Sequence, residues 1–181
     1  MLIKEVDVLD IDFNAFQEIE NYALLTAGTI DNFNMMTATG FLCGKFFLKP
    51  MIQVYIRPNR YTYKFFEESN HFTVSFYEKK YHSALVICGE THGNECNKSE
   101  EANLHPFKYD DVVLFEEAKI TFICEKVFHA DISEENFDSK RLHKEYYMNQ
   151  SLISECNMVP ENSNLYHRIY LGQIRKVLVN K

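Results

Sequence analysis

The sequence predicts a mainly β protein, a closed or partly closed antiparallel barrel with helices at its periphery. Several short segments alternate apolar and polar residues, which is the period of a strand with one buried face. Few of these segments are separated by helical patterns, so a parallel sheet with crossover helices is disfavoured. The chain also contains 15 Phe and 11 Tyr, and these aromatic residues favour strands over a simple helical bundle.

The first predicted elements are a short helix and two strands. Asn14 followed by Gln17 has the pattern of a capped helix start. From residue 22 the period changes from helical to alternating, and we expect strands at 22–27 and 35–41. A turn around Asp31-Asn32 would join them, because Asp and Asn favour turns.

The middle of the chain predicts two further strands with a helix between them. Segment 51–56 alternates Ile and Val with polar or aromatic residues, and segment 72–76 alternates in the same manner. Between them, Thr62 is expected to cap a helix that runs to about Ser69 and buries two phenylalanines.

The second half predicts one more helix and three strands. Residues of 81–88 place an apolar face on a helix, and Gly89 is expected to end it. The strands are expected at 112–115, 118–130 and 165–179. Gly172 would mark a bulge in the last strand, whereas the polar segment 133–164 has no clear period.

Size and charge restrict the classes of function. At 181 residues and 21.4 kDa, the chain is expected to form a single domain over residues 1–181. Its formal net charge is −7 and no run of basic residues offsets it, so we expect no nucleic-acid partner. A small phosphate needs only two or three local cations, so a phosphorylated small ligand remains compatible with the composition.

The absence of recognisable targeting signals, together with the cysteine usage, leads us to expect a cytoplasmic protein. No early segment has the layout of a secretory signal, and no apolar run is long enough to span a bilayer, so no membrane partner is expected. The five cysteines contain no Cys-x-x-Cys, which fits a reducing compartment better than a disulfide framework.

Several common site motifs are absent from the sequence. Neither a dinucleotide-binding Gly-x-Gly-x-x-Gly after a strand nor a Walker phosphate loop is present. A Gly-x-Ser-x-Gly elbow is also missing, which disfavours a hydrolase. His92 and Cys96 lie four apart, but no second pair has metal-ligand spacing, so no metal site is predicted.

One candidate anion site lies at the Pro58-Asn59 turn. Arg57 and Arg60 flank this turn, and Thr62 stands where the next helix is expected to begin. The N-terminus of a helix favours a phosphate, and arginine adds paired donors for its oxygens. The alternative is that both arginines are solvated and Thr62 is only a helix cap.

A second candidate follows the predicted helix over 81–88. Gly89 and Gly93 flank Thr91-His92, and Lys98 comes shortly after. Glycines allow close approach of the backbone to a ligand, and a lysine can neutralise a terminal phosphate. The alternative is an ordinary loop with an exposed Lys98.

A third candidate enters a predicted strand. Segment 34–37, Asn-Met-Met-Thr, carries an amide, a hydroxyl and edge N–H groups that could bond a polar ring system. The alternative is structural, because Asn and Thr are common in turns and strands.

Read in order, these segments resemble the flavin reductase-like, flavoredoxin-type family of FMN-binding split-barrel proteins. The matches are Asn-x-Met-Thr at 34–37, Tyr-x-Arg-Pro-x-Arg-Tyr-Thr at 55–62, and Cys-Gly at 88–89 followed by Gly93 and Lys98. A fourth, weaker match is His-Arg-x-Tyr-x-Gly at 167–172. The resemblance spans residues 20–179.

The resemblance implies a six-stranded antiparallel Greek-key barrel that binds FMN, usually as a homodimer whose second subunit helps to cover the flavin. By position, the residues that would line the isoalloxazine and ribityl portions are Asn34, Met35, Met36 and Thr37. Those that would hold the phosphate are Arg57, Arg60, Thr62, His92, Gly93 and Lys98. His167 and Tyr170 would lie near the subunit contact or the flavin face.

The chain departs from the family pattern at three positions. Gly40 stands where the family commonly has Trp, which we expect to open the surroundings of the flavin. His92 replaces a common Ser, and Asn97 replaces a common Asp before the lysine. These changes affect the identity of the substrate more than that of the cofactor.

The resemblance implies an FMN-dependent oxidoreductase that accepts hydride from NADH or NADPH and passes electrons to a small acceptor or a redox protein partner. Flavin chemistry needs no acid–base dyad, so no catalytic side chain is assigned. One alternative is an FMN-binding electron carrier without direct NAD(P)H activity. Another is a barrel whose cofactor pocket has decayed.

Overall fold

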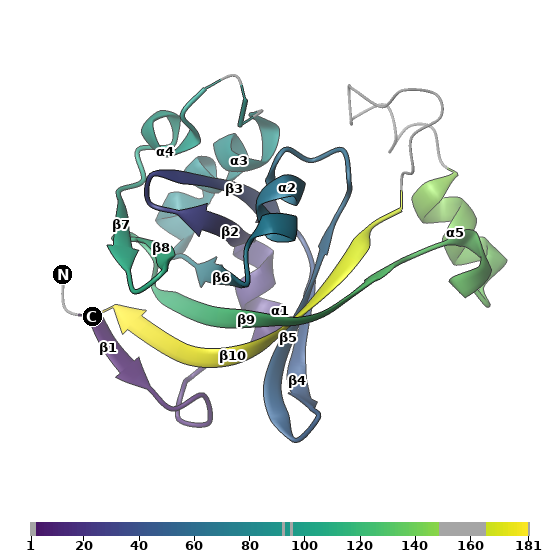
Figure 1. Ribbon diagram of the computed structural model, residues 1–181, viewed down its shortest axis with the longest axis horizontal. Coiled ribbons are helices and arrows are strands. Elements are labelled where there is room, and N and C mark those ends of the chain that lie inside the picture. Colours follow the sequence, from purple (N-terminus) through teal and green to yellow (C-terminus); the bar gives the residue numbers. More distant parts are fainter. Residues whose placement is uncertain (1–2, 92, 95, 149–165, 181) are drawn as a thin grey trace.

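The computed structural model describes residues 3–91, 93–94, 96–148 and 166–180, and these form an antiparallel sheet surrounded by short helices (Figure 1). The strands are β1 (Ile3–Val6), β2 (Ala23–Thr29), β3 (Asn32–Ala38), β4 (Phe41–Phe46), β5 (Lys49–Ile56), β6 (His71–Phe76), β7 (Pro106–Tyr109), β8 (Val112–Phe115), β9 (Ile120–Asp131) and β10 (Arg168–Asn180). The α-helices are α1 (Ala15–Glu18), α2 (Thr62–Glu68), α3 (His82–Glu90), α4 (Lys98–Glu101) and α5 (Lys140–Tyr147). Three 3₁₀ turns complete the set, η1 (Ile19–Asn21), η2 (Lys79–Tyr81) and η3 (Glu134–Asn136). The predicted class, mainly β with peripheral helices, is confirmed.

The main sheet has eight strands in the order β3-β2-β6-β9-β10-β5-β4, with β1 also paired to β10. Strands β3 and β4 stand at opposite ends of this order, yet only residues 39–40 connect them. Three peptide units span at most about 11 Å, so the sheet must curl until its two ends meet at that corner. The result is a barrel that is not hydrogen-bonded along the seam between β3 and β4.

The inside of the barrel is filled by alternate residues of its strands. In β5, the side chains of Ile52, Val54 and Ile56 are fully buried, whereas Gln53 and Tyr55 between them are partly exposed. This confirms the alternation expected for 51–56. Phe65 and Phe66 of α2 close the same core, as the sequence predicts.

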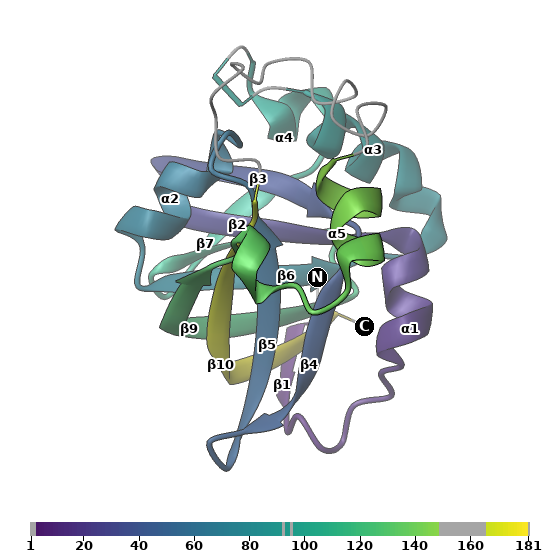
Figure 2. The ribbon, with the colours of Figure 1, turned by 90° about the vertical axis from the view of Figure 1, so that its right-hand side faces the viewer.

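A second apolar cluster lies outside the barrel, between β3 and α3. It contains Met35 of β3 together with Leu85 and Cys88 of α3. Figure 2 shows α3 and α4 over the end of the sheet that contains β2 and β3, with α1 and α2 on opposite sides of the view. This cluster therefore fixes α3 against the strand that carries the first candidate segment.

Two predicted local features are confirmed. The side chain of Asn14 accepts a hydrogen bond from the backbone N–H of Phe16 at 3.1 Å, as a helix cap does. The pairing of β10 with β9 shifts register between Leu171 and Gly172. A side chain at Gly172 would clash with the ring of Phe72, which explains the glycine there.

Three local predictions are wrong. Thr62 does not cap α2: Tyr61 holds the cap position, and the Thr62 hydroxyl is instead bonded to Asn34. Gly89 does not end α3, which continues to Glu90. The strand expected over 35–41 ends at Ala38, because the chain turns there and β4 begins at Phe41.

Five described strands and α-helices were not predicted, namely β1, β4, β7, α4 and α5; the last of these lies in the segment that had no clear period. Ser139 begins α5 by accepting a hydrogen bond from the N–H of Leu142 at 3.3 Å. The predicted start of the last strand at residue 165 lies outside the described residues. Within the described ranges, no helix combines the length and the apolar composition needed to cross a membrane.

The β4–β5 hairpin ends in a turn of unusual composition. Phe47 and Leu48 form its two-residue loop, and both have positive φ, at 49° and 60°. Such a turn normally uses Asn-Gly, because bulky residues are strained in this region. Both side chains are also exposed, at 66% and 85%. The tip projects away from α3 and α4 (Figures 1 and 2).

We therefore expect the double substitution Phe47→Asn, Leu48→Gly to raise the free energy of unfolding by about 1–2 kcal/mol, by relieving strain in the turn. Urea unfolding would measure it. Leu9→Asn, at an equally exposed residue without positive φ, serves as the control and should leave the midpoint unchanged. Equal stability of the double variant and the parent would contradict the strain.

Candidate functional site

A small hollow of about 60 Å³ lies where β3, the start of α2 and the end of α3 meet. Its lining residues are Met36, Thr37, Arg60, Tyr61, Thr62, Gly89, Thr91, Gly93 and Lys98. They come from the three segments that the sequence singled out, 34–37, 55–62 and 88–98. The hollow has several times the volume of about 10–15 Å³ that one buried water needs.

Lys98 is the buried cation of this hollow. Its residue is only 7% exposed, and its Nζ donates to the carbonyl oxygens of Cys88 at 2.8 Å and Met35 at 3.1 Å. An ammonium carries three donors, so these two bonds leave one N–H for the hollow that Lys98 lines. Burial lowers the pKa of Lys98, and the nearby Arg60 contributes in the same direction.

The charge of Lys98 is not neutralised by the thiol beside it. Burial raises the pKa of Cys88 to about 11, so Cys88 is an uncharged thiol at neutral pH. Among the described residues, the hydrogen-bond partners of Lys98 are carbonyl groups and not carboxylates. A buried cation without a counter-charge is costly, so the arrangement favours an anion in the hollow.

Asn34 connects the three segments beneath the hollow. It is 5% exposed, and its Nδ2 donates to the Thr62 hydroxyl at 2.7 Å. The loop at Gly93 lies so close that a side chain there would clash with the Asn34 amide. Asn34 therefore holds α2 and the Gly93 loop onto β3, and its expected contact with a flavin stays a prediction.

The other residues of segment 34–37 have mixed positions. The side chain of Met35 is buried in the cluster with α3, so it faces away from a ligand. Met36 and Thr37 line the hollow. The Thr37 hydroxyl donates to the carbonyl of Leu85 and thereby ties β3 to α3.

Arg57 is not among the residues that line the hollow. Its Nε donates to Nε2 of His167 at 3.2 Å, and Nδ1 of His167 lies 2.7 Å from the Tyr147 hydroxyl. Burial lowers the pKa of His167 to about 4, with Arg57 and Arg60 contributing. His167 is therefore neutral at neutral pH, and the contact with Arg57 makes Nε2 the acceptor and Nδ1–H the donor to Tyr147. The expected contact of Arg57 with a phosphate stays a prediction, and His92 lies outside the described residues.

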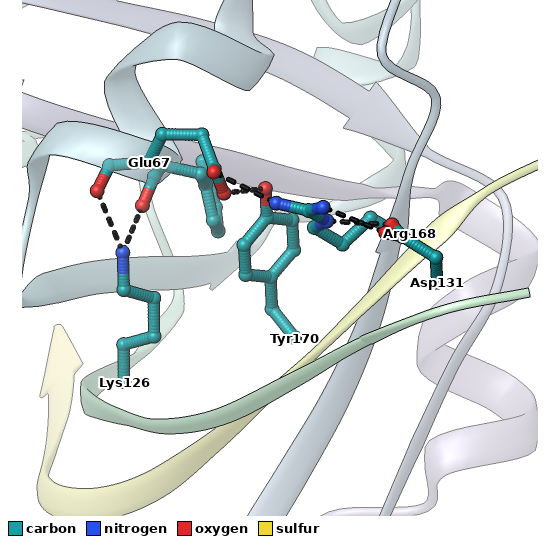
Figure 3. Close-up of polar contacts among 6 residues, drawn as sticks. Glu67, Lys126, Asp131, Arg168 and Tyr170 are labelled. Carbon is teal, nitrogen blue, oxygen red and sulfur yellow. Dashed lines mark hydrogen bonds and ion pairs between the residues drawn. The ribbon is translucent and has the colours of Figure 1, made fainter. Parts of the chain in front are cut away.

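The far end of α2 is anchored by a network of charged groups (Figure 3). Glu67 accepts from the Tyr170 hydroxyl at 2.5 Å and from Arg168 at 2.7 Å. Arg168 also forms a bidentate pair with Asp131, at 2.6 and 2.7 Å. Desolvation acts to raise the pKa of Glu67, but the bonds from Tyr170 and Arg168 outweigh it and lower that pKa. Lys126 donates to the last carbonyls of α2, at Phe66 and Glu67.

Three lining residues, Tyr61, Gly89 and Thr91, were not among the residues predicted to contact FMN, although all three lie inside the motifs at 55–62 and 88–98. Tyr61 stands between Arg60 and Thr62, and its hydroxyl accepts from Lys64 at 2.7 Å. Thr91 lies between the two glycines and donates to the Ile87 carbonyl at 2.6 Å. Their position within these motifs is the sequence signal that could have identified them as lining residues.

Two of the three departures from the family pattern are described by the structure. A Cβ at Gly40 would meet no described atom within 4 Å, so the space there is open. Asn97 caps α4 by accepting from the N–H of Ser99 at 3.2 Å, which Asp could do equally well. The Asn97 departure therefore preserves the position of Lys98, the first residue of α4.

Comparison with known proteins relates the fold to one family. The model of the flavin reductase like domain matches residues 19–180. No curated protein matches the chain.

Among solved structures, the FMN-binding domain of a flavin reductases-like enzyme from Shewanella baltica is 14% identical, with a TM-score of 0.64 over 98% of this chain and 77% of that one. Flavoredoxin of Desulfovibrio vulgaris is 17% identical, with a TM-score of 0.62 over 88% and 69%. An FMN-binding protein from Thermus thermophilus is 16% identical, with a TM-score of 0.61 over 86% and 68%. The predicted split-barrel fold is confirmed, with β1 and β4 bringing the sheet to eight strands.

The lowered pKa of His167 should make the free energy of unfolding depend on pH. Its pKa is about 4 in the folded state and about 6.5 when unfolded, so below pH 6.5 the unfolded chain binds the extra proton. We expect the parent to lose about 1–2 kcal/mol more stability between pH 7 and pH 5 than His167→Gln, which cannot titrate. Urea unfolding at both pH values measures this difference. His129→Gln, at an exposed histidine, should behave like the parent, and parallel losses in the parent and His167→Gln would contradict the expectation.

Proposed function

This chain belongs to the flavin reductase-like domain family, and on that premise we propose that it binds FMN and acts as a flavoprotein oxidoreductase. The observation that carries the proposal is the buried ammonium of Lys98 at a hollow shared by three distant segments. A phosphate monoester in this hollow would supply the counter-charge that the described partners of Lys98 do not.

The hydrogen-bonding states of Thr62 and Lys98 support this assignment. Thr62 accepts from Asn34, so its own proton is available to donate into the hollow. Lys98 has one donor left, and Arg60 adds a guanidinium to the lining. Because Gly93 has no side chain, a phosphate could approach its backbone closely. Thr91 has committed its proton to Ile87 and can only accept, so we assign it no phosphate bond.

The oxidoreductase activity is proposed from the chemistry of the cofactor. A bound flavin supplies hydride acceptance and onward electron transfer, with NADH or NADPH as the proposed donor. The residues of this chain would then bind the phosphate and fix the orientation of the ring. No described side chain is needed as an acid or base, and none is assigned.

An electron carrier is the second candidate, because flavoredoxin is among the structures that share this fold. It would accept electrons from a redox protein partner.

For either candidate function, we propose that the protein forms a homodimer. The exposed Phe46, Phe47 and Leu48 at the hairpin tip support self-association, since large exposed apolar groups favour an interface.

We expect Arg60→Ala to weaken FMN binding by about 1.5–3 kcal/mol, on the order of 10- to 150-fold in Kd, through loss of a charged hydrogen bond. Quenching of FMN fluorescence measures the Kd. Arg175→Ala removes an arginine of β10 that pairs with Glu125 instead of lining the hollow, so it should bind like the parent. Unchanged affinity in Arg60→Ala would remove the phosphate assignment.

Reduction by nicotinamide separates the two candidate functions. Purified protein should be yellow and release FMN on denaturation, and anaerobic NADH or NADPH should bleach its visible absorbance within seconds if it is a reductase. Chemical reduction with dithionite is the control for a competent flavin. Flavin that dithionite bleaches but both nucleotides leave oxidised would reject the reductase and favour the carrier.

A further inference from the structure

The C-terminal motif at 167–172 contacts both ends of the segment that carries Arg60. At its start, His167 accepts from Arg57 at 3.2 Å. Beyond it, Arg168 and Tyr170 bind Glu67 at 2.7 and 2.5 Å (Figure 3). One stretch of β10 and its preceding residue therefore hold the segment from the end of β5 to the end of α2.

Backbone hydrogen bonds connect Arg57 to Arg60 and to the start of α2. The N–H of Arg60 donates to the Arg57 carbonyl at 3.0 Å, and the N–H of Tyr63 donates to the Arg60 carbonyl at 2.9 Å. These successive bonds form a tight turn that leads directly into α2. We call residues 57–62 the anion turn, and a displacement of Arg57 would displace the whole turn.

His167 also connects the anion turn to α5. Its second nitrogen, Nδ1, bonds the Tyr147 hydroxyl at 2.7 Å, and Tyr147 is the last residue of α5. Among the described residues, the charged and titratable groups that face the imidazole are Arg57, Arg60 and Tyr147. A neutral imidazole has one acceptor and one donor, so it can satisfy Arg57 and Tyr147 together.

Aromatic packing holds α5 in place around this bond. The Tyr147 ring lies 4.7 Å from Tyr166 and 5.6 Å from Phe137, measured between centroids. His143 stacks on Tyr166 and is 2.8 Å from its hydroxyl. The opposite side of α5 is polar, with the exposed pair Arg141–Glu145. The buried face of α5 is therefore directed at the residues that precede β10.

We propose that Tyr147 and His167 are positioning residues that couple the docking of α5 to the anion turn, so that the affinity for FMN depends on α5. This inference rests on the proposed function. Neither residue lines the hollow, and both act through Arg57. In this proposal, the fourth sequence match, at 167–172, positions the phosphate-binding segment 57–62.

The test compares two adjacent tyrosines of α5. Tyr147→Phe removes the hydroxyl but keeps the buried ring, whereas Tyr146→Phe makes the same change at a neighbour that is 58% exposed. We expect Tyr147→Phe to raise the Kd for FMN on the order of 2- to 10-fold, the usual range for one hydrogen bond, and Tyr146→Phe to leave it unchanged. Equal affinities in the parent and Tyr147→Phe would overturn the coupling.

A second pair of variants separates positioning from packing. His167→Gln retains one acceptor and one donor and should largely preserve FMN affinity, whereas His167→Leu should weaken it more than Tyr147→Phe does. Loss of the same affinity in His167→Gln and His167→Leu, in proteins with native unfolding midpoints, would overturn the proposed role of the imidazole bonds.

Amide hydrogen exchange of the protein without FMN distinguishes failure of this inference from failure of the proposed function. The N–H groups of Arg60 and Tyr63 should exchange several-fold faster in Tyr147→Phe than in the parent or Tyr146→Phe. If the parent does not bind FMN, the proposed function fails and exchange alone decides the coupling. Faster exchange would support the coupling, and unchanged exchange would overturn it.

Discussion

The buried ammonium of Lys98 is the constraint on which the site depends. It bonds a carbonyl of β3 and a carbonyl near the end of α3, and thus joins two elements that are distant in sequence. An uncompensated charge in this position would be unfavourable in a protein selected only for stability. A ligand that brings the opposite charge into the hollow that Lys98 lines would offset this cost.

Close approach of backbones makes this arrangement possible. Gly89 lies within α3, and a Cβ there would be 3.2 Å from the Cβ of Thr37, so a larger residue would push α3 away from β3. At Gly93, an added Cβ would clash with Oδ1 of Asn34, so a larger residue would likewise push this loop away from β3. The two glycines therefore act in packing rather than in ending a helix, and they bring Lys98 within reach of β3.

The sequence predicted what depends on period and order, and missed what depends on distant contacts. The alternation of buried and exposed residues in β5 and the convergence of the three motifs could both be predicted from the sequence. The Thr62 cap failed because Asn34, 28 residues earlier, competes for the hydroxyl. Strand β4 was missed because Phe47-Leu48 carries no turn signal. The contact of Arg57 with His167 could not be predicted because the two residues are 110 positions apart in the sequence.

The structure constrains the surroundings of Lys98 more tightly than those of Gly40. The anion turn and the residues around Lys98 are held by hydrogen bonds to β3, to α3 and to His167, the residue before β10, so their geometry is a property of the barrel itself. At Gly40, by contrast, nothing described lies within 4 Å of an added Cβ. A side chain there would therefore meet no constraint from the described part of this fold. Variation at such a position would leave the hydrogen bonds around Lys98 unchanged.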